Sequence, residues 1–295
     1  MAKAISIPVS SGGALRDYIS LTKPRLSLFV LFTCAVGIWF APGEIDFMRM
    51  LGTLCLTALL VGSANAFNCY LERDTDALMQ RTRTRALPDG RLEPRPAFIF
   101  ACVTGMISFG GLFFVANSLT AFAGLLALFT YVCCYTPMKR KTTLALYVGA
   151  IPGAMPPLMG WTAVQPQLDP GALWLFGLMF FWQIPHFLAI SLYLKKDYDR
   201  ARLKVFSNVY GERLTIVAAL ISSIVLLLVS LVPVSIGLTT SEYGFVAASV
   251  GGLLVLVAAF GLSERKSQGW ARLLFFSTLF YLFCIFAGLL IGKTG

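Results

Sequence analysis

Charged residues are scarce in this chain. Only 13% of its 295 residues are Asp, Glu, Lys or Arg, whereas 57% are hydrophobic. A soluble domain carries about 25% charged residues, so the composition excludes an ordinary soluble protein. Short segments of alternating polarity are also missing, which excludes a transmembrane β-barrel. Long apolar runs are present instead, and they predict an all-α polytopic membrane protein.

Acidic residues are fewer than basic ones, and the basic residues are unevenly placed. About nine apolar runs are each long enough to cross roughly 30 Å of hydrocarbon as a helix. Of the 24 Lys and Arg residues, all but Arg49 and Lys293 fall on one side of these runs. The positive-inside rule makes that side cytoplasmic, with a cytoplasmic N-terminus and a periplasmic C-terminus. The net charge of +10 therefore reflects topology, and no nucleic-acid partner is predicted. The predicted spans are about 26–41, 48–71, 97–116, 119–136, 143–163, 171–194, 214–236, 243–262 and 273–292.

The chain has one histidine and no Cys-x-x-Cys pair. Its seven cysteines lie in or beside apolar runs, which is typical of small buried side chains rather than of disulfides or metal sites. No pattern of a cleavable signal precedes the first apolar run, and no loop is long enough for a soluble domain. We therefore expect a cytoplasmic N-terminal segment, 1–22, and a single intramembrane domain, 23–295, whose helices surround a central cavity.

A polar stripe continues the second predicted span. Asn65, Asn68, Glu72 and Asp76 follow one another at intervals of three or four residues, which places them on one face of a helix. Two carboxylates one turn apart, together with amide oxygens, form a site of hard oxygen ligands. Mg²⁺ prefers such sites, where it keeps several waters and bridges to substrate phosphates. The stripe therefore predicts a magnesium site at the membrane surface.

Two arginines follow this stripe. Arg81 and Arg85 are one turn apart if the chain stays helical, and the arginine side chain is suited to binding phosphate oxygens. Carboxylates, metal, phosphate and arginines then form one coherent set. The alternative is a solvated loop whose acids and bases only neutralise one another. The amide of Asn65 argues against that alternative, because a polar group within hydrocarbon costs free energy unless it has a partner.

The only histidine, His186, lies inside the sixth predicted span. Tyr193 and Asp197 follow it at intervals of seven and four residues, so a continuous helix would place all three on one face. The alternative is a packed core histidine that meets a backbone carbonyl freed by Pro185. If this face and the first stripe turn towards each other, they enclose one cavity with an apolar interior and a polar mouth. Such a cavity suits a substrate with a long apolar tail and a diphosphate head.

Two stretches carry a resemblance to a known family. The pattern NxxNxxxExxxDxxMxRTxxR, residues 65–85, resembles the signature of the intramembrane aromatic prenyltransferase superfamily. The stretch WQIPHFLAIS, residues 182–191, is similar to the haem-modifying branch of that superfamily. The resemblance covers about residues 20–290, which is nearly the whole chain.

The sequence departs from the superfamily pattern at two places. Much of the superfamily has Asp where this chain has Glu72, which changes the oxygens that reach a metal. The second aspartate motif of the superfamily is reduced here to Tyr193, Lys196 and Asp197. A second site made only of carboxylates is therefore not expected, and a lysine is expected to neutralise diphosphate charge instead.

The resemblance implies transfer of a farnesyl group from farnesyl diphosphate to a vinyl group of haem b, with addition of water and release of diphosphate. Under this reading Mg²⁺ arrives with the diphosphate, Tyr193 stabilises an allylic cation, and His186 meets the haem substrate. The expected catalytic residues are Glu72, Asp76, Arg81, Arg85, Tyr193 and Lys196. The expected substrate-binding residues are Asn65, Asn68, Lys139, Arg140, His186 and Asp197, and the expected metal ligands are Asn68, Glu72 and Asp76.

Three other functions fit parts of the pattern. A prenyltransferase that modifies the ring of a quinone precursor would share the metal and arginine residues, and His186 is the residue that distinguishes the two acceptors. An ion-coupled transporter would also bury polar groups, but it needs access from both sides of the membrane. A non-catalytic haem-delivery scaffold leaves the metal and arginine stripe unexplained. The resemblance implies the cell inner membrane as the location, with haem A synthase or terminal oxidase assembly factors as candidate protein partners.

Overall fold

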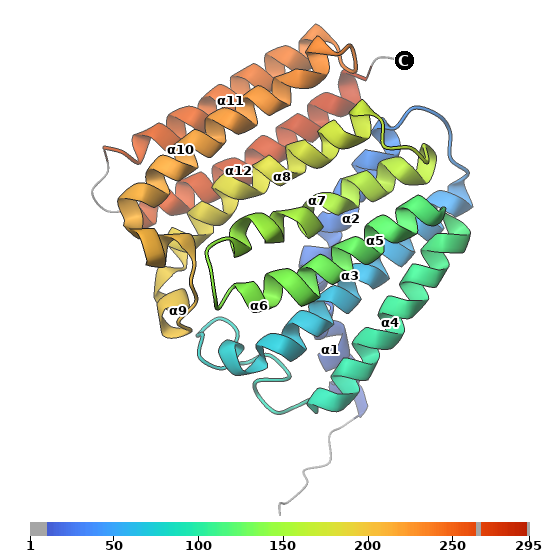
Figure 1. Cartoon of the computed structure of the whole chain (residues 1–295), viewed down its shortest axis with the longest axis vertical. Coiled ribbons are helices and arrows are strands. Elements are labelled where there is room, and N and C mark those ends of the chain that lie inside the picture. The colour runs from blue at the N-terminus through green and yellow to red at the C-terminus, as the bar shows by residue number, and fades with distance from the viewer. Residues whose placement is uncertain (1–10, 264–266, 294–295) are drawn as a thin grey trace, which may run out of the picture.

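The chain folds into a bundle of helices, seen here in a computed structural model (Figure 1). The structure describes residues 11–263 and 267–293, and within these ranges it forms no strand beyond an isolated bridge between Thr239 and Lys293. The elements are α1 (Ser11–Leu21), α2 (Pro24–Phe40), α3 (Phe47–Asp76), α4 (Pro94–Val115), α5 (Ser118–Phe129), the π-helical turn η1 (Thr130–Tyr135), α6 (Thr136–Met138), α7 (Ala145–Val164), α8 (Pro170–Tyr193), α9 (Lys195–Arg200), α10 (Phe206–Ser235), α11 (Ser241–Phe260) and α12 (Ser267–Ile291).

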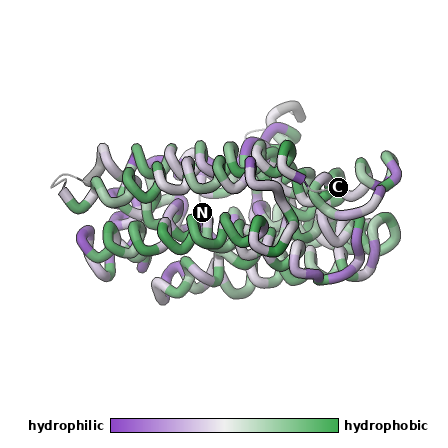
Figure 2. The backbone as a smooth tube through the Cα atoms, turned by 90° about the horizontal axis from the view of Figure 1, so that it is seen from above, coloured by the Kyte–Doolittle hydropathy of each residue, from purple (hydrophilic) through white to green (hydrophobic). Residues whose placement is uncertain are grey.

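The helices make this chain a multi-pass membrane protein, as the composition predicts. Seven of the described helical segments are long and apolar enough to cross a membrane, or eight if the bent pair α1 and α2 is one broken span. Helix α7, which corresponds to a further predicted span, carries three prolines and is not among them. The count of nine and the orientation of the termini therefore stay predictions. Figure 2 shows hydrophobic stretches along the helices and hydrophilic positions mainly near their ends.

Consecutive helices pack side by side around the bundle. Helix α3 packs between α2 and α4, α5 joins α4 to α7, and α8 packs on α7, α10 and α12. Helix α12 closes the arrangement by meeting α2, where Lys293 Nζ donates to the carbonyl oxygens of Trp39 at 2.9 Å and Ala41 at 3.0 Å. The loops after α3 and α6 lie with α9 at the lower left of Figure 1, opposite the α2–α3 and α7–α8 connections. We call this side, formed by residues 77–93, 139–144 and 194–205, the basic end.

The starts of several helices are set by local sequence. Asp46, Asn117 and Asp169 cap α3, α5 and α8, because each side chain accepts a hydrogen bond from the backbone N–H three residues later. Proline opens α2, α4 and α8, where its missing N–H costs no helical hydrogen bond. These capping residues and prolines determine the residue at which each of these helices begins.

Helices α2 and α7 approach each other closely through two glycines. A Cβ atom at Gly37 would lie 2.1 Å from the carbonyl oxygen of Pro157, and one at Gly160 would lie 2.0 Å from that of Cys34. Since both obstacles are backbone atoms, a side chain at either position requires the helices to move apart. Small residues permit this kind of backbone contact in membrane bundles, where van der Waals packing contributes much of the association energy.

We expect Gly160→Ala to destabilise the protein by roughly 1–3 kcal/mol, because an added methyl group overpacks this contact. The measurement is thermal unfolding of the purified protein in detergent. Gly177→Ala in α8 is the matched control, since a Cβ there meets no atom within 4 Å. Equal melting temperatures for the two variants would show that α2 and α7 can move apart without loss of stability.

The N-terminal segment is part of the bundle rather than a tail, as far as it is described. Helix α1 packs on α3, where Leu21 and the half-buried Tyr18 join a cluster that contains Ala66 and Cys69. Helices α1 and α2 meet at an angle of 43°, and between them Lys23 adopts a left-handed conformation with φ of 50°. The break coincides with the predicted boundary between segments 1–22 and 23–295, and residues 1–10 lie outside the described residues.

Candidate active site

A cavity of about 290 Å³ lies at the basic end between α3, η1 and α8. Its wall contains two carboxylates and five cations that come from four separate parts of the chain. They are Glu72 and Asp76 of α3, Arg81 and Arg85 of the following loop, Lys139 after α6, Lys204 after α9, and Lys23 of the α1–α2 break. The fold therefore gathers charged side chains that are up to 181 positions apart, from Lys23 to Lys204, around one small volume.

The predicted stripe on α3 faces this cavity. Helix α3 runs without interruption to Asp76, so Asn68, Glu72 and Asp76 stand one above another in the cavity wall. Asp76 is only 1% exposed and Glu72 9% exposed. Asp74, two residues from each acid, points away, and its side chain is 78% exposed. The helical spacing thus separates two buried carboxylates from a solvated one.

Each buried carboxylate is paired with one cation. Lys139 Nζ lies 2.8 Å from Glu72 Oε1, and Arg85 Nη1 lies 2.7 Å from Asp76 Oδ2. Burial opposes the charge on Lys139, but neighbouring Tyr135 and the Glu72 carboxylate outweigh it and hold the pKa of Lys139 above its ordinary value. Lys139 therefore stays protonated at neutral pH and can bind an anion.

Two further contacts complete the polar floor. Lys23 Nζ donates to Asn68 Oδ1 at 2.8 Å, and Asn68 Nδ2 donates to Thr136 Oγ1 at 3.5 Å. Sequence reasoning missed Lys23, because it counted this lysine only as one of the basic residues that precede the first predicted span, about 26–41. The left-handed break brings this lysine to the cavity wall, and Pro24 signals the helix boundary without signalling which way the lysine turns.

Asp76 has an oxygen that the protein itself does not satisfy. Its Oδ1 is buried and makes no hydrogen bond within the described structure, although Oδ2 is paired with Arg85. An unpartnered buried carboxylate oxygen costs free energy, which a bound cation would recover. The described residues contain no group of three His, Cys, Asp or Glu side chains that could hold a metal alone. Glu72, Asp76 and Asn68 thus fit a metal that keeps waters and shares phosphate oxygens, which is the habit of Mg²⁺.

The loop that carries Arg81 and Arg85 is held at both of its ends. Thr82 Oγ1 donates to the backbone oxygen of Asp76 at 2.9 Å, which folds the loop back over the end of α3. Arg91 Nη2 donates to the backbone oxygen of Thr84 at 3.1 Å, and its Nε lies 3.2 Å from Asp17 Oδ1 on α1. The loop forms turns rather than the helix considered for it, yet both arginines still reach the cavity.

Two tyrosines line the cavity because of the π-helical turn η1. Tyr131 and Tyr135 both stand in the cavity wall, and the Lys139 ammonium lies 4.5 Å from the centre of the Tyr135 ring. A π-helical turn inserts an extra residue into a helix and often occurs at functional sites. Sequence reasoning missed both tyrosines, since nothing in the hydrophobic pattern marks such a turn. Further in, Leu146 and Phe187 make the cavity apolar.

Two predicted binding residues lie outside the cavity wall. Asn65 is buried, but its Nδ2 donates to the backbone oxygen of Thr22 at 3.1 Å and so ties α3 to the α1–α2 break. Arg140 is exposed and contacts only the Leu71 carbonyl, at 3.5 Å, among the described hydrogen bonds. Of the two neighbouring cations Lys139 and Arg140, only the first reaches the carboxylates.

The second predicted stripe does not form as expected. Helix α8 ends at Tyr193, and Leu194 leaves helical geometry before α9 begins, so Asp197 does not share a helical face with His186. Asp197 pairs with Arg200 at 3.4 Å. Lys196 is exposed on α9. None of these lines the cavity, and the expectation of two converging polar stripes is therefore wrong for α8.

His186 and Tyr193 instead face α12. The His186 ring packs on Phe275 with ring centres 4.8 Å apart, and the Tyr193 ring stacks on the same phenylalanine at 6.3 Å. His186 is 8% exposed, and its chain neighbour Phe187 is a cavity residue. The histidine is thus next to the cavity wall rather than part of it.

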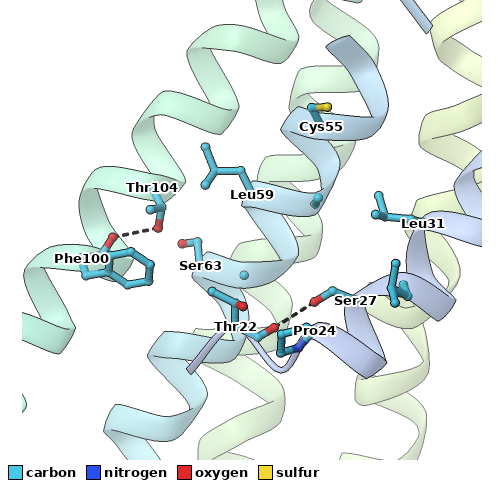
Figure 3. A pocket seen from close by; sticks show the side chains of 12 residues that line it. Thr22, Pro24, Ser27, Leu31, Cys55, Leu59, Ser63, Phe100 and Thr104 are labelled. Atoms are coloured by element: carbon cyan, nitrogen blue, oxygen red, sulfur yellow. Dashed lines mark hydrogen bonds between the residues drawn. The ribbon is translucent and has the colours of Figure 1, made fainter. Parts of the chain in front are cut away.

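A second cavity of about 430 Å³ lies between α2, α3 and α4 (Figure 3). Its lining is mostly apolar and contains no charged side chain. The polar groups in it are engaged locally: Ser27 Oγ donates to the Thr22 carbonyl and Thr104 Oγ1 to the Phe100 carbonyl (Figure 3). Lacking charge, this cavity does not suit a diphosphate. The cavity at the basic end, which combines two buried carboxylates with cations, is the candidate active site.

Comparison with known proteins agrees with this geometry. The family model of the UbiA prenyltransferase family matches residues 30–283. The chain is 48% identical to a protoheme IX farnesyltransferase of Anaeromyxobacter dehalogenans (strain 2CP-C), over 95% of this chain and 94% of that protein. A solved digeranylgeranylglyceryl phosphate synthase structure shares the fold with a TM-score of 0.80 at 14% identity, covering 94% of this chain and 98% of that one.

A second solved structure adds ligands to the comparison. It is a UbiA homolog from Archaeoglobus fulgidus bound to GPP and Mg²⁺, with a TM-score of 0.65 at 14% identity over 92% of this chain and 99% of that chain. At this identity the likeness shows the fold alone. The family model and the identity to the Anaeromyxobacter protein go further, and they confirm the resemblance read from the sequence motifs: the chain belongs to the UbiA prenyltransferase family.

Proposed function

We propose that the protein transfers the farnesyl group of farnesyl diphosphate to a vinyl group of haem b. The observation that carries the proposal is the cavity at the basic end, whose wall combines two buried carboxylates and five cations with apolar side chains. This arrangement fits an amphiphilic substrate whose head is a metal-bound diphosphate and whose tail is hydrocarbon. The identity of 48% to a protoheme IX farnesyltransferase supports haem b as the acceptor.

Glu72, Asp76 and Asn68 would hold Mg²⁺. A protein of the same fold, the UbiA homolog from Archaeoglobus fulgidus, was solved with GPP and Mg²⁺ bound, which supports a metal requirement. When bound, the metal would neutralise charge on the diphosphate and so favour its departure. The protein supplies Lys139 and Arg85, which already lie one hydrogen bond from these carboxylates. If metal and diphosphate displace these ion pairs, Lys139 and Arg85 would be free to bind the diphosphate oxygens.

The remaining cavity residues govern what happens to the farnesyl group. Arg81 and Lys23 add fixed positive charge where the leaving group develops negative charge, which is the most effective place for electrostatic stabilisation. Tyr131 and Tyr135 present aromatic faces that attract an allylic cation, each by about 0.5–2 kcal/mol. They take the role that the sequence assigned to Tyr193.

The bond changes balance without an oxidant or reductant. The bond from farnesyl C1 to the diphosphate oxygen breaks, and diphosphate leaves with the electron pair. The vinyl group donates its electron pair to C1, and water then adds to the carbon next to the porphyrin ring and loses a proton to solvent. The product is a hydroxylated farnesyl adduct of haem, which haem A synthase or oxidase assembly factors would receive. The charged cavity would face the cytoplasm from the inner membrane, consistent with the placement of basic loops.

Turnover by the purified protein tests this proposal. Protein in lipid nanodiscs is incubated with farnesyl diphosphate, Mg²⁺ and either haem b or 4-hydroxybenzoate, and products are identified by mass spectrometry. We expect a farnesylated, hydrated haem, one diphosphate per product, and loss of both when EDTA removes the metal. Farnesylation of 4-hydroxybenzoate but not of haem b would assign the protein to the quinone-precursor branch. If no diphosphate is released with haem b or with 4-hydroxybenzoate, both assignments are contradicted.

A further inference from the structure

His186 lies between two aromatic rings where α8 packs on α12. Its ring is stacked on Trp182 with centres 4.7 Å apart and planes 22° apart, and it packs on Phe275 at 4.8 Å and 31°. The series continues from Phe275 to Tyr193 at the basic end of α8. Four aromatic rings thus follow one another between α8 and α12, and the imidazole is the only one among them that offers a nitrogen ligand to a metal.

One threonine holds the polar edge of this imidazole. His186 Nδ1 lies 2.8 Å from Thr278 Oγ1, and Thr278 is fully buried on α12. The same Oγ1 lies 2.6 Å from the backbone oxygen of Phe275. The backbone oxygen of Thr278 in turn accepts from Trp182 Nε1 at 2.7 Å. Thr278 is therefore held through both its hydroxyl and its backbone oxygen, and the hydrogen bond to Phe275 limits rotation of the hydroxyl.

The two contacts of this hydroxyl decide which ring nitrogen carries the proton. A carbonyl oxygen can only accept, so the single hydroxyl hydrogen of Thr278 must point to Phe275. Two lone pairs would otherwise face each other at 2.6 Å. The hydroxyl then accepts from His186, whose Nδ1 must carry hydrogen. In the neutral imidazole the other nitrogen, Nε2, is left with a free lone pair.

We propose that Thr278 is a positioning residue that fixes His186 in the Nδ1–H tautomer, so that Nε2 serves as an axial ligand to the iron of the haem substrate. This inference rests on the proposed function. Neutral imidazole is a common iron ligand, and its non-ligating N–H is usually held by an acceptor that fixes the orientation of the ring.

The tautomer can be measured directly, because His186 is the only histidine of the chain. Protein labelled with nitrogen-15 histidine should give one pair of ring signals, with a protonated Nδ1 and an unprotonated Nε2. Addition of ferric haem b should perturb the Nε2 signal most strongly. A protonated Nε2 in the free protein, or an Nε2 signal that haem leaves unchanged, would overturn the inference without any variant having to fold.

Two variants separate positioning from packing. Thr278→Val keeps the shape but removes the acceptor, and we expect haem b to bind 10- to 100-fold more weakly, with loss of histidine-type ligation in the electron paramagnetic resonance spectrum. Thr278→Ser restores the hydroxyl and should restore both. The KM for farnesyl diphosphate should stay unchanged in both variants, because its site lies on α3 and the loops of the basic end.

Thr120→Val is the matched control for loss of a buried threonine contact. Thr120 Oγ1 lies 2.9 Å from Thr162 Oγ1 between α5 and α7, away from His186, so haem binding should not change. If the wild-type protein modifies haem but Thr278→Val binds and ligates haem as the wild type does, the positioning role of Thr278 is rejected. Wild-type protein that never modifies haem would instead reject the proposed function itself.

Discussion

Asp76→Asn is expected to lower kcat/KM for farnesyl diphosphate by about 10²–10³-fold, which is the cost of removing one well-placed electrostatic group from an active site. The substitution keeps the size of the side chain but removes the charge that pairs with Arg85 at 2.7 Å. It also replaces the buried, unpartnered Oδ1 that we assign to the metal. The measurement is steady-state turnover as a function of Mg²⁺ concentration, and the apparent affinity for Mg²⁺ should fall together with the rate.

Asp74→Asn is the control for this substitution. Asp74 lies on the same helix two residues earlier, but its side chain is 78% exposed and its nearest cation, Arg73, is 3.8 Å away at the surface. Exposed pairs of this kind contribute little, so we expect kcat/KM within about twofold of the wild type. Similar losses in the two variants would mean that the effect follows net charge at the basic end rather than a metal site on one helical face.

Lys139→Met is expected to raise the KM for farnesyl diphosphate by about 10- to 100-fold. Charge-assisted hydrogen bonds contribute roughly 1.5–3 kcal/mol, and this ammonium group is poised 2.8 Å from Glu72 at the cavity wall. Methionine preserves the length of the side chain and its contact with Tyr135. Without the Lys139 cation, the buried Glu72 carboxylate loses its ion-pair partner. The substrate-free protein should therefore also unfold at a lower temperature.

Arg140→Met tests the neighbouring cation. Arg140 is exposed, and it contacts the Leu71 carbonyl at 3.5 Å rather than a carboxylate of the cavity. We expect its KM and melting temperature to match those of the wild type. A large rise in KM for Arg140→Met, with none for Lys139→Met, would show that the loop rearranges when diphosphate binds and exchanges the two side chains.

The helical face that we propose for the metal follows from local spacing alone. Asn68, Glu72 and Asp76 lie on a helix that continues unbroken through the membrane surface, and a helical period of 3.6 residues places them on one face whatever surrounds them. Their burial and their position in the cavity wall agree with the prediction. Such agreement is expected wherever the functional residues belong to a single regular element.

The residues around His186 show the limit of the same reasoning. The spacing of His186, Tyr193 and Asp197 assumes one helix, but α8 ends at Tyr193 and a new helix begins at Lys195. A helix end without proline or glycine leaves no local signal. The partner of the histidine, Thr278, is 92 positions away, and only the packing of α8 on α12 brings the two together.

Composition, loop charge and helical period thus establish a helical membrane protein with a carboxylate stripe at its basic end, because each of these depends on residues near one another in the chain. The cations that meet the stripe, the π-helical turn that presents two tyrosines, and the tautomer of His186 depend on contacts between distant helices. Such contacts depend on which helices pack closely against each other, as α2 and α7 do at their glycines. The hydrophobic pattern of a helix does not determine which other helices it will pack against.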